Sequence, residues 1–243
     1  MRLATRIGLL AATAVSLSAA ATSAAAAVPP ATRVVRLSNE VTVTRWAHPL
    51  EVADIWTEPF ARGRRVARLH MSTEEGWPEV YLVLADATAP GRETWLRIRV
   101  PGRPNGRTGW VRRNALGRLN STDMDLRVNL GALRATLLRD GRPIWHAPIG
   151  DGKPSTPTPT GHFWIRELMQ VPPGSIYGPY AFGTSDYSTL SEWPNGGVVG
   201  IHGTNEPWLI PGHPSHGCIR MRNASITYLA YHLPIGAPVE VFR

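Results

Sequence analysis

Proline and glycine punctuate the whole chain, with 22 prolines and 23 glycines among 243 residues. Proline lacks the amide hydrogen that a helix interior needs, and glycine lowers helix stability, so this density leaves little room for long helices. Between the breaks, apolar and polar residues alternate. Leu96, Ile98 and Val100 alternate with arginines, which is the period of a half-buried strand. The sequence therefore predicts a mainly β protein with many turns and one or two short helices.

The first 27 residues have the order of a secretory signal peptide. Arg2 and Arg6 give a positive start, residues 7–21 form an uncharged apolar run, and residues 24–27 are four alanines. Small residues after a short apolar run are typical of a signal-peptidase site. The run is short for a membrane span, although an uncleaved anchor is the alternative. We expect residues 1–27 to be a signal peptide and the protein to be secreted, in the periplasm or at the cell wall.

The remaining residues are enough for two small domains. Residues 28–44 indicate a linker with one strand, and residues 45–119 carry short alternating segments separated by turns. The polar run at residues 120–123 indicates a joint, and residues 124–243 then begin a second pattern of strands. We expect a small β barrel over 45–119, and a second domain over 124–243 that can be separated from it.

Four features indicate the secondary structure of the second domain. Asp140-Gly141 lies between two apolar segments, which is a strong hairpin signal. Residues 176–197 are rich in aromatic residues and glycine without a clear period, which predicts a long loop or flap. Apolar residues at helical spacing predict a helix after residue 223, with Asn223 as its cap and Pro234 as its limit. Residues 238–242 indicate a closing strand.

The formal net charge of the chain is +8, and almost all of its positive charge is arginine, with Lys153 as the one lysine. A nucleic-acid-binding module would gather this charge on one face beside aromatic platforms, whereas here the arginines are scattered. An exported protein meets anionic wall polymers and carboxylate-rich peptides instead. We therefore expect no nucleic-acid partner.

Cys218 is the only cysteine. A lone thiol in an exported protein indicates either a functional role or a free, oxidation-prone thiol without a disulfide partner. A thiol attacks carbonyls as its thiolate, so it needs a base or a cationic neighbour, and His202 and His216 are the candidates. Gly217 lets the backbone approach a substrate, and amide groups beside the cysteine would hold a developing oxyanion. The pattern predicts nucleophilic catalysis by Cys218.

The order of three motifs gives a sharper expectation. Residues 158–163 (TPTGHF), 201–205 (IHGTN) and 215–221 (SHGCIRM) are followed by GAPV at 236–239. Together these residues resemble the L,D-transpeptidase catalytic-domain family, over about residues 125–242. The stretch from Trp95 to Val111 resembles bacterial Src-homology-three-like barrels, small modules common beside cell-wall hydrolases.

The resemblance to L,D-transpeptidases implies a β-sandwich fold, no cofactor and no metal. It implies that Cys218 attacks a tetrapeptide stem of peptidoglycan and forms a thioester, which a diaminopimelate amine of a second stem resolves, with His202 as general base. The backbone of Gly217 and Cys218 would form the oxyanion hole, and Arg220 would organise the site or pair with a substrate carboxylate. The remaining candidates for catalysis or substrate binding are His216, Gly203, Ser215, Tyr180 and Trp208, with Tyr177 and Trp193 as further aromatic candidates for the donor groove.

Several alternatives remain open. The thioester can be resolved by water, which would make the protein a carboxypeptidase or hydrolase of wall peptides. The protein can also be a non-catalytic wall-binding protein whose active part is the barrel. A zinc site formed by His202, His213, His216 and Cys218 is a third possibility, but its spacing matches no familiar metal motif. Papain-like hydrolases place the cysteine before the histidine, which is the reverse of the order here. The sequence does not indicate an oligomeric state.

Overall fold

The computed structural model describes residues 32–192 and 194–243. The predicted signal peptide at 1–27 lies outside the described residues, as does the start of the predicted linker. Within the described part, no helix is long and apolar enough to cross a membrane. Residues 31–243 pack as one unit.

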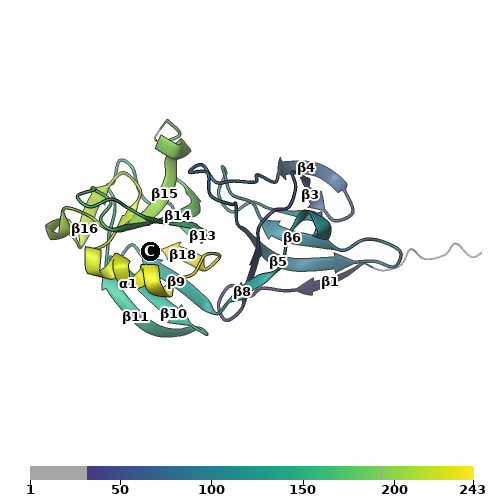
Figure 1. The fold of residues 1–243 in the computed structure, drawn as a ribbon, viewed down its shortest axis with the longest axis horizontal. Coiled ribbons are helices and arrows are strands. Elements are labelled where there is room, and N and C mark those ends of the chain that lie inside the picture. The colour runs from purple at the N-terminus through teal and green to yellow at the C-terminus, as the bar shows by residue number, and fades with distance from the viewer. Residues whose placement is uncertain (1–31, 193) are drawn as a thin grey trace, which may run out of the picture. The chain divides into compact units, whose positions relative to one another are not determined.

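The first half of the chain forms an eight-stranded sheet (Figure 1). Its strands run in the order β4-β3-β7-β6-β5-β2-β8, and β1 also pairs with β5. The strands are β1 (Arg33–Arg36), β2 (Thr44–Ala47), β3 (Asp54–Glu58), β4 (Arg62–Arg68), β5 (Tyr81–Thr88), β6 (Trp95–Arg99), β7 (Thr108–Arg112) and β8 (Asn120–Thr122). A short 3₁₀ helix, Arg113–Ala115, follows β7.

The core of this sheet consists of the apolar residues that alternate along the sequence. Leu96 and Ile98 of β6 are fully buried, while Arg97 between them is exposed, so the predicted strand is confirmed. Residues 120–123, expected to be a polar joint, instead place β8 against β2, with Trp46 paired to Asn120. Only Asp123 separates β8 from the next strand. The two halves of the chain are therefore joined without a linker.

The second half forms a ten-stranded sheet in the order β11-β10-β9-β18-β13-β14-β15-β17-β12-β16. The strands are β9 (Met124–Asn129), β10 (Arg134–Arg139), β11 (Arg142–Pro148), β12 (Gly150–Gly152), β13 (Gly161–Gln170), β14 (Tyr180–Tyr187), β15 (Val198–His202), β16 (Gly212–Ser215), β17 (Ile219–Arg220) and β18 (Pro238–Phe242). Two 3₁₀ helices lie at Pro194–Gly197 and Pro207–Leu209.

The long strand β13 connects the two parts of this sheet. Its first half, from Gly161 to Trp164, pairs with β18, and its second half, from Ile165 to Gln170, pairs with β14. The buried apolar side chains from both parts form one core, which includes Phe163, Ile165 and Phe182. The described residues are mainly β, as the sequence predicts.

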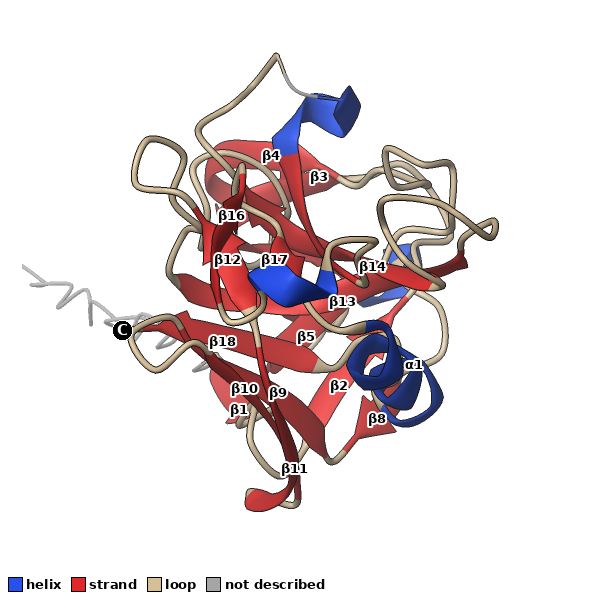
Figure 2. Ribbon diagram, turned by 90° about the vertical axis from the view of Figure 1, so that its left-hand side faces the viewer, coloured by secondary structure: helices blue, strands red, loops and turns tan. Residues whose placement is uncertain are grey.

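The predicted hairpin is confirmed, and the predicted helix needs one correction. Arg139 pairs with Arg142 across Asp140 and Gly141, which both have positive φ, as a two-residue turn of this kind requires. The one α-helix among the described residues, α1 (Asn223–His232), lies beside the strands in Figure 2. Asn223 is its first residue and not its cap: the side-chain oxygen of Asn223 accepts a hydrogen bond from the Thr204 amide at 2.9 Å.

The predicted loop at 176–197 is wrong over its central part, because β14 occupies residues 180–187. Six consecutive residues of β14, Ala181 to Asp186, are buried. A strand buried on both faces shows no alternation, so the sequence lacks the period by which such a strand is recognised. Loops remain at 171–179 and 188–192, on either side of β14.

The two sheets share a buried polar contact. The guanidinium of Arg166 on β13 donates from Nε to Glu79 Oε1 at 2.8 Å and from Nη2 to Glu79 Oε2. Arg166 is 3% exposed and Glu79 is fully buried. Beside them, Trp164 Nε1 donates to the carbonyl of Val80 at 2.8 Å. These contacts form a buried interface between the two sheets, and the separability of the two halves stays a prediction.

Candidate active site

The central strands of the second sheet place the two predicted catalytic residues on one face. β15 and β17 are parallel neighbours, with Ile201 opposite Ile219 and His202 opposite Arg220. Cys218 immediately precedes β17, so this register sets it beside Gly200. Because alternate residues of a strand share a face, Gly200, His202 and Cys218 point to the same side.

Gly200 keeps the space between the thiol and the imidazole open. A Cβ at this position would lie 3.9 Å from both Cys218 Sγ and His202 Cδ2, so a longer side chain would occupy the path between them. The amide of Gly200 also donates a hydrogen bond to Cys218 Sγ at 3.4 Å. Gly200 is therefore part of the candidate site, and the sequence pointed to it only through its place two residues before His202.

The orientation of His202 is set by its own loop. Its Nδ1 lies 2.6 Å from the carbonyl oxygen of Gly203, so in the neutral ring Nδ1 carries the hydrogen and Nε2 is the basic nitrogen. A side chain at position 203 would collide with Asn223 Oδ1, only 2.5 Å from the added Cβ. Gly203, predicted to bind substrate, thus holds the imidazole in place.

Burial disfavours charge on both His202 and Cys218. Burial is the main cause that lowers the pKa of His202 to about 4, and the positive charge of Arg220 lowers it further. The hydrogen bond to Gly203 acts in the opposite direction and raises this pKa. Burial also raises the pKa of the Cys218 thiol above its ordinary value, although the Gly200 amide and Arg220 act in the other direction. Both shifts favour a thiol beside a neutral imidazole, which is the arrangement of a nucleophile and its general base.

A tight turn presents the cysteine. Gly217 has φ of +127°, a conformation that residues with a side chain rarely adopt. The hydroxyl of Ser215 accepts from the Gly217 amide at 3.0 Å and donates to the Cys218 carbonyl at 2.6 Å. Thr158, from the upstream TPTG motif, donates to the Gly217 carbonyl at 2.8 Å.

Two of the candidate residues make hydrogen bonds inside this turn. Ser215 is 1% exposed and lines the small pocket, and its hydroxyl bonds the backbone of Gly217 and Cys218. The Gly217 amide therefore already has an acceptor within the turn. Substrate binding by Ser215 and an oxyanion hole at the Gly217 and Cys218 backbone stay predictions.

Cys218 and His202 lie where two pockets meet. The larger pocket, about 340 Å³, is lined by apolar residues of β13, β14 and β15 and by three glutamates. The smaller pocket, about 80 Å³, lies towards Arg220 and His216. Tyr177, in the loop between β13 and β14, lines both pockets, and its ring meets the His202 ring edge-on at 4.8 Å between centroids. The thiol is therefore accessible from two directions, with Tyr177 between them.

Arg220 forms an ion pair within the protein, and its pairing with a substrate carboxylate stays a prediction. Its Nη1 donates to Glu206 Oε2 at 3.1 Å, and the Glu206 side chain is 43% exposed, so this pair contributes little to stability. Its buried Nε has no hydrogen-bond partner in the structure. Arg220 thus lines the small pocket, and its positive charge acts on the thiol of Cys218.

The other predicted residues lie farther from the chemistry. Tyr180 lines neither pocket; its hydroxyl lies 3.4 Å from that of Tyr231 on α1. Trp208 is 73% exposed and also lines neither pocket. His216 lies at the small pocket, but its ring is exposed and Nε2 accepts a hydrogen bond from Lys153 Nζ at 2.9 Å. Trp193 lies outside the described residues.

No group of three or more histidine, cysteine, aspartate or glutamate side chains in the described ranges has the geometry of a metal site. His213, one member of the rival zinc set, lies 2.5 Å from Asp151 through its Nδ1. His202 uses its Nδ1 on a backbone carbonyl, as described above.

Residues 123–241 match a family model described as the YkuD L,D-transpeptidase catalytic domain. Over 116 residues the chain is 39% identical to the protein YkuD of Bacillus subtilis, named as an L,D-transpeptidase; the match covers 48% of this chain and 64% of that protein. Over 112 residues it is 30% identical to ErfK/SrfK of Salmonella typhimurium, also named as an L,D-transpeptidase, covering 39% of this chain and 36% of that protein. The chain thus spans less than two thirds of the length of these relatives.

Solved structures of L,D-transpeptidases are also similar in part. The enzyme of Enterococcus faecium matches with 26% identity and a TM-score of 0.38, over 49% of this chain and 50% of that one. LdtMt1, solved in complex with imipenem, matches with 18% identity and a TM-score of 0.41, over 88% of this chain and 92% of that one.

Proposed function

We propose that this chain, whose residues 123–241 match the YkuD model of L,D-transpeptidase catalytic domains, is a peptidoglycan L,D-transpeptidase with Cys218 as its nucleophile. The donor is a stem tetrapeptide, and the acceptor is the side-chain amine of diaminopimelate in a second stem. The observation that carries the proposal is the neutral thiol and imidazole of Cys218 and His202, held on one face of the sheet at the meeting point of two pockets.

The first half-reaction forms a thioester. Nε2 of His202 takes the proton of the Cys218 thiol while Sγ attacks the carbonyl that precedes the terminal D-alanine. The oxyanion faces the backbone amide of Cys218. When the intermediate collapses, the C–N bond breaks and the departing amine of D-alanine takes the proton from His202. A neutral resting pair suits this sequence, because the imidazole must be unprotonated to accept the first proton.

The second half-reaction transfers the acyl group. An acceptor amine attacks the thioester carbonyl, and its proton passes to His202. The C–S bond breaks, a new amide bond joins the two stems, and the thiolate recovers the proton from His202. Water in place of the amine gives hydrolysis of the same thioester, so the acceptor decides between cross-linking and carboxypeptidase activity.

A carbapenem is a chemically sensible trap for this thiol. Its strained β-lactam carbonyl offers the acyl group that the donor peptide would offer, without a D-alanine to release. We expect one covalent adduct on the wild-type protein and none on Cys218→Ala, measured by intact mass. An adduct of equal yield on Cys218→Ala would move the nucleophile elsewhere.

The predicted leader and the scattered positive charge of the chain support a secreted protein that acts at the wall, where anionic polymers retain it. Charge-based retention is tested by measuring how much purified protein binds intact cell-wall sacculi at low and at high salt, because salt screens the attraction between the arginines and anionic polymers.

The short strands β6 and β7, with their Trp-Leu-Arg-Ile and Gly-Trp-Val sequences, support the further proposal that the first sheet is a bacterial Src-homology-three-like module.

The proposed activity is tested by its products. The purified protein is incubated with a diaminopimelate-containing tetrapeptide, and the products are separated and identified by mass. A cross-linked dimer with loss of one D-alanine, absent for Cys218→Ala, is the expected result. Loss of D-alanine without any dimer would identify a carboxypeptidase. No change in the peptide at all, with a folded protein, would contradict both.

A further inference from the structure

The two pockets that meet at Cys218 differ in charge. The small pocket is lined by Arg220 and His216 and by no acidic residue. The large pocket is lined by Glu74, Glu75 and Glu167 and by no lysine or arginine. A substrate that spans the thiol therefore passes from a positive side to a negative side, which sets its orientation.

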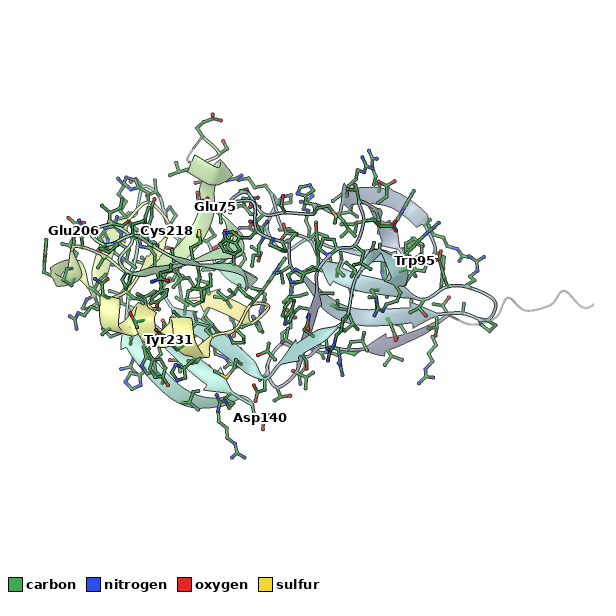
Figure 3. All side chains as sticks on the ribbon, in the orientation of Figure 1. Glu75, Trp95, Asp140, Glu206, Cys218 and Tyr231 are labelled. Atoms are coloured by element: carbon green, nitrogen blue, oxygen red, sulfur yellow. The ribbon has the colours of Figure 1, made fainter. Side chains whose placement is uncertain are left out.

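Two of the three glutamates come from the first sheet's half of the chain. Glu74 and Glu75 lie in the turn of residues 73–77, between β4 and β5. The turn is closed by a bridge between Ser72 and Pro78 and by a hydrogen bond from the Thr73 amide to the Trp77 carbonyl at 2.7 Å. Figure 3 labels Glu75 close to Cys218, and both residues line the same pocket.

Side-chain hydrogen bonds hold this turn against the second half of the chain. Arg166 Nη1 donates to Glu74 Oε2 at 2.9 Å, and the hydroxyl of Tyr187 donates to Glu74 Oε1. Thr73 Oγ1 donates to Glu167 Oε2 at 2.5 Å. Burial alone would raise the pKa of Glu74, but the charge of Arg166 and the Tyr187 hydrogen bond lower it. Glu74 is thus an anionic anchor that holds the turn in place.

Three glutamates, Glu74, Glu75 and Glu167, gather at this end of the pocket, and no lysine or arginine lines it. Arg166 already forms two hydrogen bonds with the fully buried Glu79, so one guanidinium faces both Glu79 and Glu74. Glu75, next to Glu74 and exposed, adds a further carboxylate at the rim, where it can meet a ligand entering from solvent. An apolar pocket with a carboxylate rim and a reactive thiol suits an organic cation more than an anion.

We propose that the turn of residues 73–77 forms the acceptor side of the active site, and that Glu75 draws the ammonium group of the incoming amine to the thioester on Cys218. This inference rests on the proposed function and specifies its acceptor as a cationic amine. The bound ammonium releases one proton to water, and the free amine then attacks the thioester. Its remaining excess proton passes through His202 to the leaving thiolate as the C–S bond breaks. Through this turn the first half of the chain would contribute to the active site, whether or not it also binds the cell wall.

Two small acceptors test this inference on the full-length protein charged with a tetrapeptide donor. At neutral pH glycinamide is mainly an ammonium ion, whereas hydroxylamine is mainly uncharged. Glu75→Gln should raise the KM for glycinamide about fivefold, the value of one partly exposed charge pair, and leave the KM for hydroxylamine as in the wild type. Glu58→Gln, an exposed glutamate of β3 that lines neither pocket at the thiol, is the matched control and should alter neither value.

The outcomes separate the two proposals. An unchanged KM for glycinamide in Glu75→Gln overturns the inference, and so does an equal rise for both acceptors, because general damage to the pocket would explain it. If the wild-type thioester is formed but hydrolysed without transfer to either amine, the proposed transferase itself fails, and the acceptor side fails with it. Because hydrolysis without transfer is measured on the wild-type protein, it is distinguished from any effect of the Glu75→Gln substitution.

Discussion

At the scale of single residues, burial explains the state of the catalytic pair. Desolvation disfavours charge on either group, so the pKa of His202 falls and that of Cys218 rises. The motifs predicted which residues meet, and the structure brings Cys218 and His202 together on one face. The sequence did not indicate that the pair is neutral, because protonation depends on the depth of the site and not on residue type.

The lowered pKa of His202 predicts a pH-dependent stability. The unfolded chain takes up a proton near pH 6.5, whereas the folded chain does so only near pH 4. Between these values the unfolded state binds more protons, so this contribution is complete above pH 6.5 and is lost as the pH falls towards 4. From pH 7 to pH 4.5, urea unfolding should show the wild type losing about 2 kcal/mol more than His202→Asn does. Parallel losses in the two proteins would contradict the buried neutral imidazole.

At the scale of elements, local signals decided what the sequence could predict. The Asp140-Gly141 turn carries its own backbone preference, and the alternation of β6 is visible in the chain, so both were predicted. β14 was missed because its burial on both faces, between β13 and β15, is a property of the assembled sheet. The contribution of the 73–77 turn to the pocket was missed for the same reason, since Glu75 and Cys218 meet only through the packing of distant segments.

The buried pair between the sheets predicts a large energetic effect of one substitution. Glu79→Gln leaves the charge of Arg166 buried without its main partner, which should cost about 3–5 kcal/mol in the free energy of unfolding. The matched control is Glu93→Gln, whose partner Arg112 is half-exposed with it, and the expected loss there is below about 1 kcal/mol. Chemical denaturation measures both. Equal losses for the two variants would show that the Arg166 contact does not stabilise the interface.

At the scale of the whole molecule, the two sheets pack into one compact unit. Trp164, Arg166 and Glu167 of β13 contact Val80, Glu79 and Thr73 across the interface. The sequence suggested a separable catalytic domain because its polar run at 120–123 resembles a linker, whereas three of those residues form β8. Composition alone does not distinguish a polar edge strand from a joint.

A fragment of residues 123–243 therefore should not retain the properties of the full protein. Without the first half, Trp164 is exposed and Arg166 loses both of its carboxylate partners. We expect a fragment with a clearly lower melting temperature and weak activity, and we expect recovery when residues 32–122 are coexpressed. Thermal unfolding of the fragment beside the full chain measures this. Equal stability of the two would mean that the catalytic half folds independently.

The central claim is that Cys218 forms a thioester with the donor peptide. The most direct measurement is the mass of the protein after rapid mixing with a tetrapeptide and acid quenching, followed by mass mapping of its peptides. The account predicts an added mass equal to the tetrapeptide after loss of D-alanine, confined to the peptide that contains Cys218, and accumulating more slowly in His202→Ala by roughly two to four orders of magnitude. Transfer activity that persists in Cys218→Ala, or an adduct on another residue, would contradict it.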